Sequence, residues 1–252
     1  MNLTKRVPYW YLDHCKIGVK NGNVFASSES GSLNIPVDVG LLLLGPGVSI
    51  TTNALTLSSK LKINVAVSSS NNTPSCILSV VGKIGSQDYA KNQASFVSDP
   101  SRSIIIAKNL IKQRFPLIHL NNPLKIEQLR GIEGSEVKKL YKSVFGPNFI
   151  RNYKSTDDSN VFLNIANNTL YNLTKLACIQ YGLSPHLGFI HKKRNSFVYD
   201  ISDVFKITEY FSEIRDSNSI KSCLSRLNEY FIKIKFFKKI EGLFSVFSDQ
   251  RQ

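Results

Sequence analysis

Three side chains have the chemistry to bind one divalent cation: Glu133, His191 and Asp203. Glu133 lies four residues after Leu129 and four before Val137, within a stretch whose apolar period is helical. Residues four apart share one face of a helix, so this carboxylate points along an apolar stripe. Because burying an ionised carboxylate alone is costly, Glu133 is predicted to have a compensating partner.

Two further acids share the apolar face of a helix expected over residues 200–214. Asp203 precedes Ile207 by four residues, and Asp200 precedes Val204 by four. Acids also favour helix N-termini, where they cap free N–H groups and complement the helix dipole. That structural interpretation suits Asp200 as well as a functional one, but it is weaker for Asp203, which lies one turn further in.

His191 ends the apolar segment 187–191. A lone histidine in such a place is more often a core or surface residue than a functional one. If it meets Glu133 and Asp203, which the spacing permits, the three leave coordination positions open on a cation. Carboxylate oxygens favour Mg²⁺ or Mn²⁺, and the imidazole makes Mn²⁺ more favourable. An open divalent site beside a basic surface suits phosphoryl transfer.

The charge balance indicates either a polyanionic partner or a surface that only aids solubility. The 252-residue chain has 32 Lys and Arg against 18 Asp and Glu, a net charge of +14 and a pI near 9.6. Nucleic acids fit such an excess, since each phosphate contact releases condensed counterions. Basic side chains gather in three places, on two expected helices and directly after His191: Arg102, Lys108, Lys112 and Arg114; Lys138 and Lys139; and Lys192, Lys193 and Arg194. The alternative interpretation is that these are solvated surfaces.

Membrane insertion and redox chemistry are not indicated. Unbroken apolar runs such as 41–44 are far shorter than the about 20 residues that span a bilayer. Residues 1–12 lack the apolar segment of a signal peptide, so a cytoplasmic protein is expected. The cysteines are far apart in sequence, which excludes a CxxC site: Cys15, Cys76, Cys178 and Cys223. An even count allows two disulfides, but reduced, mostly buried thiols are favoured.

Hydrophobic periodicity changes from strand-like to helical along the chain. Asn21-Gly22 predicts a hairpin turn, and Asp99-Pro100 predicts a helix start. We predict a β domain over residues 1–84, a linker over 85–94 and a helical domain over 95–252. The helices expected in the last region cover 99–114, 124–145, 158–182, 200–214 and 217–240. The interleaved lysines and phenylalanines of 230–247 could stack bases or bind a membrane surface, but helix packing explains them best.

Three segments in order resemble the motifs of the CRISPR-associated integrase, the nuclease that captures new spacers in prokaryotic adaptive immunity. They are residues 127–134 (EQLRGIEG), 188–191 (GFIH) and 196–203 (SFVYDISD). The match is closest to integrases of type I-E systems, and weaker similarity runs through nearly the whole chain. Three motifs in the right order are far more specific than any one of them.

The resemblance implies an α+β protein of two domains. The N-terminal domain would be β-sandwich-like, and the C-terminal domain would be all-helical and catalytic. The family's ligands for Mg²⁺ or Mn²⁺ fall on Glu133, His191 and Asp203, with Asp200 in a supporting position.

Other positions of the family's DNA path are matched less closely. Tyr171 and Tyr153 fall where the family has tyrosines close to the reacting DNA, although ordinary packing explains both equally well. His14 takes the place of a tyrosine wedge that splays the spacer duplex, and Ser49 and Thr56 replace arginines. The chain ends at residue 252 without the Pro-rich tail that clamps a partner in some relatives.

The implied reaction is transesterification, in which a 3′-hydroxyl of spacer DNA attacks a phosphodiester at the edge of the CRISPR repeat. The same site would cut branched DNA. The implied partners are double-stranded DNA (spacer precursor and CRISPR repeat), a second copy of this chain in a homodimer, and a small companion CRISPR-associated adaptation protein. One alternative is a non-catalytic DNA-binding scaffold of the adaptation complex. Another is a transposon-end integrase, because a related mobile-element family shares these motifs.

Overall fold

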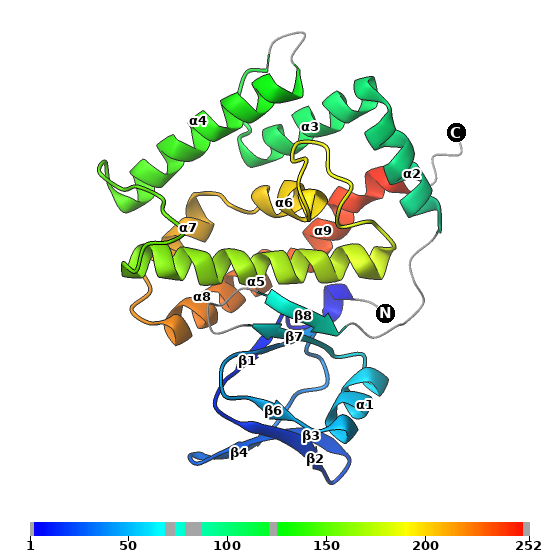
Figure 1. Ribbon diagram of the computed structural model, residues 1–252, viewed down its shortest axis with the longest axis vertical. Coiled ribbons are helices and arrows are strands. Elements are labelled where there is room, and N and C mark those ends of the chain that lie inside the picture. The colour runs from blue at the N-terminus through cyan, green and yellow to red at the C-terminus, as the bar shows by residue number, and fades with distance from the viewer. Residues whose placement is uncertain (1–2, 69–73, 79–86, 121–124, 249–252) are drawn as a thin grey trace.

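The computed structural model describes residues 3–68, 74–78, 87–120 and 125–248 (Figure 1). Strands gather at one end of the molecule and helices form the rest. The long helix α5 (Asp158–Tyr181) runs between the two regions and packs on β8 (Pro74–Leu78). This arrangement confirms the predicted α+β class, with an N-terminal β region and a C-terminal helical region.

The β region contains two four-stranded sheets. In the first, β1, β5 and β7 run parallel and β8 is antiparallel to β7, with the order β1 (Trp10–Leu12), β5 (Leu41–Leu44), β7 (Asn64–Ser68), β8. In the second, two antiparallel hairpins are extended by a parallel strand, with the order β4 (Gly31–Asn34), β3 (Asn23–Ser28), β2 (Lys16–Lys20), β6 (Ser49–Ile50). The predicted turn at Asn21-Gly22 joins β2 to β3, and both residues have positive φ, 50° and 74°.

The first sheet lies between the second sheet and the helical region, as the side chains of β5 show. All four of its leucines are buried, and successive side chains of a strand point to opposite faces. Leu42 and Leu44 pack into the core shared with the second sheet and with α1 (Thr52–Lys60). Leu41 and Leu43 pack into the core of the helical region. The β region is therefore held to the helices by the opposite face of the same strand.

The helical region surrounds one large core, which includes most of its buried aromatic rings. Besides α5 it consists of α2 (Gln87–Ser98), α3 (Pro100–Arg114), α4 (Ile126–Phe145), α6 (Ser196–Asp203), α7 (Thr208–Arg215), α8 (Ile220–Lys233) and α9 (Phe236–Phe244), with the short 3-10 turns η1 (Leu3–Lys5) and η2 (Ser245–Phe247). Within the described part of the chain, no helix is long and apolar enough to cross a membrane. Helix α3 begins as predicted, since the Asp99 carboxylate accepts the N–H of Ser101 at 2.9 Å.

The linker predicted over residues 85–94 is helical where the structure describes it, and the division into domains stays a prediction. Residues 87–94 form the first turns of α2. Their attachment to the helical region is specific, because the amide of Gln93 is buried and bonds the Ser184 N–H at 2.7 Å and the Leu187 carbonyl at 3.0 Å. Residues 85 and 86 lie outside the described ranges, and the domain boundary itself stays a prediction.

Two of the predicted helices are each interrupted. The helix expected over 200–214 is divided into α6 and α7, and α6 begins earlier, at Ser196. The helix expected over 217–240 is divided into α8 and α9 at Lys235, whose φ is 53°. In both cases the apolar period continues across the break, because the two halves pack on the same core. The break after Asp203 matters for the site described below.

Replacing Tyr9 with phenylalanine should lower the free energy of unfolding by about 1 kcal/mol. Tyr9 is 1% exposed, and its hydroxyl donates a hydrogen bond from the β region to the Leu224 carbonyl of α8. Phenylalanine would keep the ring packing and lose only this bond. Urea denaturation would measure the change, and Tyr153→Phe is the control, because Tyr153 is 72% exposed. Equal losses in both variants would contradict the prediction.

Candidate active site

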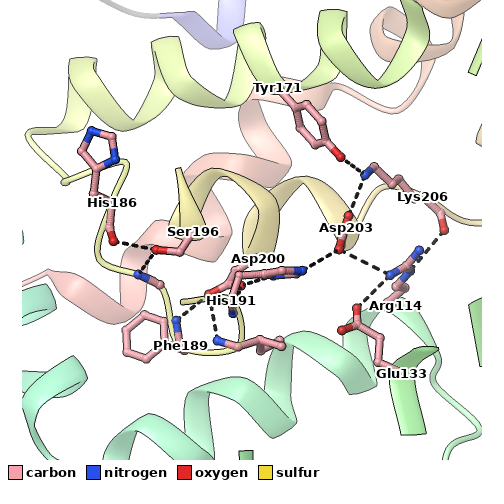
Figure 2. Close-up of polar contacts among 12 residues, drawn as sticks. Arg114, Glu133, Tyr171, His186, Phe189, His191, Ser196, Asp200, Asp203 and Lys206 are labelled. Carbon is pink, nitrogen blue, oxygen red and sulfur yellow. Dashed lines mark hydrogen bonds and ion pairs between the residues drawn. The ribbon is translucent and has the colours of Figure 1, made fainter. Parts of the chain in front are cut away.

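Figure 2 shows a polar cluster built by α3, α4, α5, α6 and the loop before α6. Arg114 is the last residue of α3, and Glu133 lies within α4. Asp203 is the last residue of α6, and His191 lies in the loop that precedes this helix. The three predicted ligands thus come from separate parts of the chain and approach one another around Arg114.

Glu133 is buried, and its compensating partner is Arg114. The guanidinium Nη1 donates to Glu133 Oε1 at 2.8 Å, and the exposed fractions of the two side chains are 3% and 9%. Burial and the neighbouring charge of Asp203 raise the pKa of Glu133, although Arg114 opposes this shift. The carboxylate is therefore a group that gains from an additional positive charge.

Asp203 stands between several cationic groups. Its Oδ1 pairs with Lys206 Nζ at 2.7 Å, while its Oδ2 lies 3.8 Å from Arg114 Nη1 and 3.9 Å from His191 Nε2. Burial alone would raise the pKa of Asp203, but the charges of Lys206, Arg114 and His191 outweigh burial and lower it. Asp203 is therefore ionised, and Oδ2 is the oxygen that faces both His191 and Arg114.

Asp200 positions His191. Its carboxylate is fully buried and accepts the backbone N–H groups of Phe189, Ile190 at 3.0 Å and His191 at 3.0 Å. It also bonds His191 Nδ1 at 2.7 Å. With Nδ1 as the donor to Asp200, Nε2 is the nitrogen that faces Asp203, and once Nε2 loses its proton its lone pair is available to a metal, as in a ligating histidine. The capping explanation of Asp200 is wrong for the helix, because α6 starts at Ser196 and the carboxylate caps the preceding loop instead.

The loop that carries His191 lies tightly against α6. A Cβ added to Gly188 would come within 2.8 Å of Asp200 Oδ2 and 2.7 Å of Ser196. Ser196 Oγ donates to the His186 carbonyl at 2.6 Å and accepts the Gly188 N–H at 2.9 Å. The glycine of the GFIH segment is therefore required by close approach, and the loop delivers His191 in a fixed place.

In metal-free protein, raising the pH above the ordinary histidine value should lower stability. Burial alone would lower the pKa of His191, but its bond to Asp200 and the charges of Asp203, Asp200 and Glu133 outweigh burial and raise it from 6.5. The folded protein then holds this proton more tightly than the unfolded chain does. The stability that it contributes is complete below 6.5 and is lost as the pH rises through the higher folded pKa.

Urea denaturation in EDTA at about pH 6 and about pH 9 would measure this loss. His191→Gln should remove most of the difference between the two pH values. A variant that keeps the full difference would assign it to other groups.

Lys206 belongs to the cluster, although its sequence position did not single it out. It follows the break after α6, is buried, and donates to Tyr171 Oη at 2.6 Å besides pairing with Asp203. Burial would lower the pKa of Lys206, but Asp203 and Tyr171 outweigh burial and raise it. The sequence did contain one signal for this pair: Lys206 lies three residues after Asp203 and between apolar neighbours, a spacing at which helical side chains can pair.

The two tyrosines carried over from the resemblance lie in different surroundings. Tyr171 lies in the cluster and holds Lys206 through its hydroxyl. Tyr153 is 72% exposed in the loop before α5, beside Lys154, and is not among the residues that the cluster brings together. A role for either at DNA stays a prediction.

The basic positions predicted for DNA are mostly on the surface, with one correction. Arg114 is buried as the partner of Glu133, so it does not line an outer basic surface. The charged residues of the turn after His191 are exposed, and Lys192 pairs with Glu127 at 3.0 Å. The remaining predicted contacts are exposed or half-buried: Arg102, Lys108, Lys112, Lys138 and His14, the last with a φ of 43°. Their contact with DNA stays a prediction.

The donor set of the cluster suits a hard divalent cation. Two carboxylates and a directed imidazole nitrogen are ligands that Mn²⁺ and Mg²⁺ accept. As they stand, however, no three His, Cys, Asp or Glu side chains among the described residues gather closely enough to hold a metal. The Arg114 guanidinium lies between Glu133 and Asp203, so metal binding requires these groups to move closer together.

A family model, related sequences and solved structures all match this chain to Cas1 proteins. The sequence model described as "CRISPR associated protein Cas1" matches residues 9–119 and 117–213. The CRISPR-associated endonuclease Cas1 of Clostridium sp. (strain SY8519) is 29% identical, over 94% of this chain and 85% of the relative. The crystal structure of TtCas1 is 27% identical with a TM-score of 0.79, over 95% of this chain and 97% of that chain.

A second solved structure, the TtCas1-DNA complex, has a TM-score of 0.78 and 27% identity, over 96% of this chain and 92% of that chain. The matched segments of the family model include Glu133, His191 and Asp203. Because that model spans most of the sequence, the chain belongs to the Cas1 family of CRISPR-associated proteins.

Proposed function

We propose that this protein is a metal-dependent DNA integrase and endonuclease. It would join 3′-hydroxyl ends of new spacer DNA into a CRISPR array and cut branched DNA at the same site. The observation that carries the proposal is the approach of Glu133, His191 Nε2 and Asp203 Oδ2 from three separate segments. The endonuclease name of the Clostridium relative and the DNA complex of TtCas1 support it.

The reaction balances as a simple exchange of phosphodiester bonds. The 3′-oxygen of the spacer bonds to a phosphorus of the repeat and loses its proton, and the oxygen that leaves this phosphorus takes up a proton. Glu133, His191 and Asp203 would hold Mg²⁺ or Mn²⁺, which when bound polarises the phosphate and favours the ionised nucleophile. The buried charge of Lys206 beside Asp203 would offset the charge of the approaching phosphate.

Exposed basic residues next to His191 support a path for the DNA beside the site. Lys192, Lys193 and Arg194 are exposed directly after His191 and would hold a phosphate near the site. We also propose that the protein works as a homodimer with a small companion adaptation protein, in the cytoplasm. Assignment to the type I-E group stays a prediction.

Strand transfer is the direct test. A labelled duplex with 3′-hydroxyl ends would be mixed with supercoiled plasmid in Mn²⁺ or in EDTA, and a duplex with 3′-dideoxy ends would lack the nucleophile. We expect label in the plasmid only with metal and a free hydroxyl. Absence of transfer even after the companion protein is added would favour the scaffold alternative.

A further inference from the structure

Arg114 occupies the position between the two carboxylates that would share a metal. Its Nη1 lies 2.8 Å from Glu133 Oε1 and 3.8 Å from Asp203 Oδ2. One nitrogen therefore faces an oxygen of each of the two carboxylates. The guanidinium is also anchored on its other side, because Nε donates to the Lys206 carbonyl at 3.2 Å. With 3% of its side chain exposed, Arg114 is a built part of the cluster and not a surface charge.

A metal and this guanidinium cannot occupy the same gap. Mg²⁺ or Mn²⁺ requires oxygen ligands at about 2.1 Å, whereas a guanidinium holds a carboxylate at about 2.8 Å. Both ligands must turn from Arg114 to the metal, and two positive groups so close would repel each other. Lys206 differs, because it pairs with Oδ1 of Asp203 and not with Oδ2, the oxygen that faces Arg114.

We propose that Arg114 is an internal counter-ion that takes the place of the metal between Glu133 and Asp203 and must move away when the metal binds. The inference rests on the proposed function and adds a determinant of metal affinity. In metal-free protein the guanidinium neutralises the buried Glu133 carboxylate, adds to the positive charge around half-buried Asp203, and so keeps the site folded. When metal enters, it takes over that role, so Arg114 and the metal compete.

Metal affinity and stability provide the test, without any measurement of activity. Mn²⁺ binding by electron paramagnetic resonance and thermal unfolding in EDTA or Mn²⁺ would be compared for the wild type, Arg114→Gln and Lys206→Gln. The apparent Kd is the intrinsic Kd divided by the fraction of open sites, so Arg114→Gln should bind Mn²⁺ at least about tenfold more tightly. Its melting temperature should fall in EDTA and recover with Mn²⁺.

Lys206→Gln is the matched control, because it removes one charge from the same cluster without opening the gap. Its loss of melting temperature should persist in Mn²⁺, since a metal at Oδ2 replaces neither contact of Lys206. If Arg114→Gln does not fold, Arg114→Lys takes its place, because lysine keeps the positive charge but lacks the planar, forked donors of the guanidinium. Its melting temperature should also recover with Mn²⁺, to a smaller extent.

Two outcomes would overturn the inference. If the wild type and the Arg114 variants bind Mn²⁺ equally, the guanidinium does not compete, and the proposed function stands unaffected. If none of the proteins binds Mn²⁺, both the inference and the metal dependence of the proposed function are wrong. In the wild type itself, the Arg114 Nε–H resonance, assigned by its loss in Arg114→Lys, should shift when Mg²⁺ is added, because its bond to Lys206 would change.

Discussion

Replacing Glu133 with glutamine should lower the rate of strand transfer roughly a thousandfold, about 4 kcal/mol in activation free energy. The substitution keeps the size of the side chain and an oxygen that can accept from Arg114, so the fold should persist. It removes the negative charge that would hold the metal, whose contribution to phosphoryl transfer is several kcal/mol. His191→Ala should have a similar effect, because it removes the imidazole nitrogen that faces Asp203.

The same change one turn away provides the control. Glu136 lies on the same helix, pairs with Lys139 at 2.7 Å and is outside the cluster. Glu136→Gln should transfer strands at the wild-type rate. DNA affinity, measured by fluorescence anisotropy at fixed salt, should stay within about threefold in all three variants, since phosphate contacts dominate affinity. Equal activity in Glu133→Gln and Glu136→Gln would exclude a catalytic role for this cluster.

Local sequence signals identified most of the fold. Asn21-Gly22 marks a turn because both residues tolerate positive φ, and Asp99-Pro100 marks a helix start because the carboxylate caps free N–H groups and proline fits the first helical position. The structure has a turn and a helix start at these places. The breaks after Asp203 and at Lys235 were missed, because hydrophobic period reports which face is buried and not whether the helix is continuous. The helical conformation of residues 87–94 was missed for a related reason, since the contacts of Gln93 are with residues about ninety positions away.

In the candidate site, too, local sequence indicated the ligands but not their long-range partners. The apolar neighbours of Glu133 required a partner, but nothing local identified it as Arg114, which lies on another helix and looked like one of several surface cations. Lys206 was missed because it lies between α6 and α7, where the expected continuous helix is interrupted. The role of Asp200 was missed because it depends on the loop before α6 packing back against α6, where its backbone N–H groups reach the carboxylate. Long-range pairing, not residue type, is what the sequence pattern lacks.

Asp200→Asn should lower the free energy of unfolding by about 3 kcal/mol and reduce strand transfer about 10- to 100-fold. The fully buried carboxylate accepts three backbone N–H groups and the Nδ1 of His191. Asparagine has one acceptor oxygen and directs an NH₂ group at donors, so at least one of them loses its partner. The ring of His191 then loses the bond that fixes its tautomer and aims Nε2 at Asp203.

Ser196→Ala separates loss of the loop from loss of the histidine. Ser196 bonds the other end of the same loop, at His186 and Gly188, and does not contact the His191 ring. It should cost about 1 kcal/mol and leave the rate of strand transfer within about threefold. If both variants lost the same stability and the same activity, Asp200 would act only by holding the loop. A larger loss of activity in Asp200→Asn, measured at a temperature where both variants are fully folded, would show that orienting His191 is its specific contribution, because only that variant frees the imidazole.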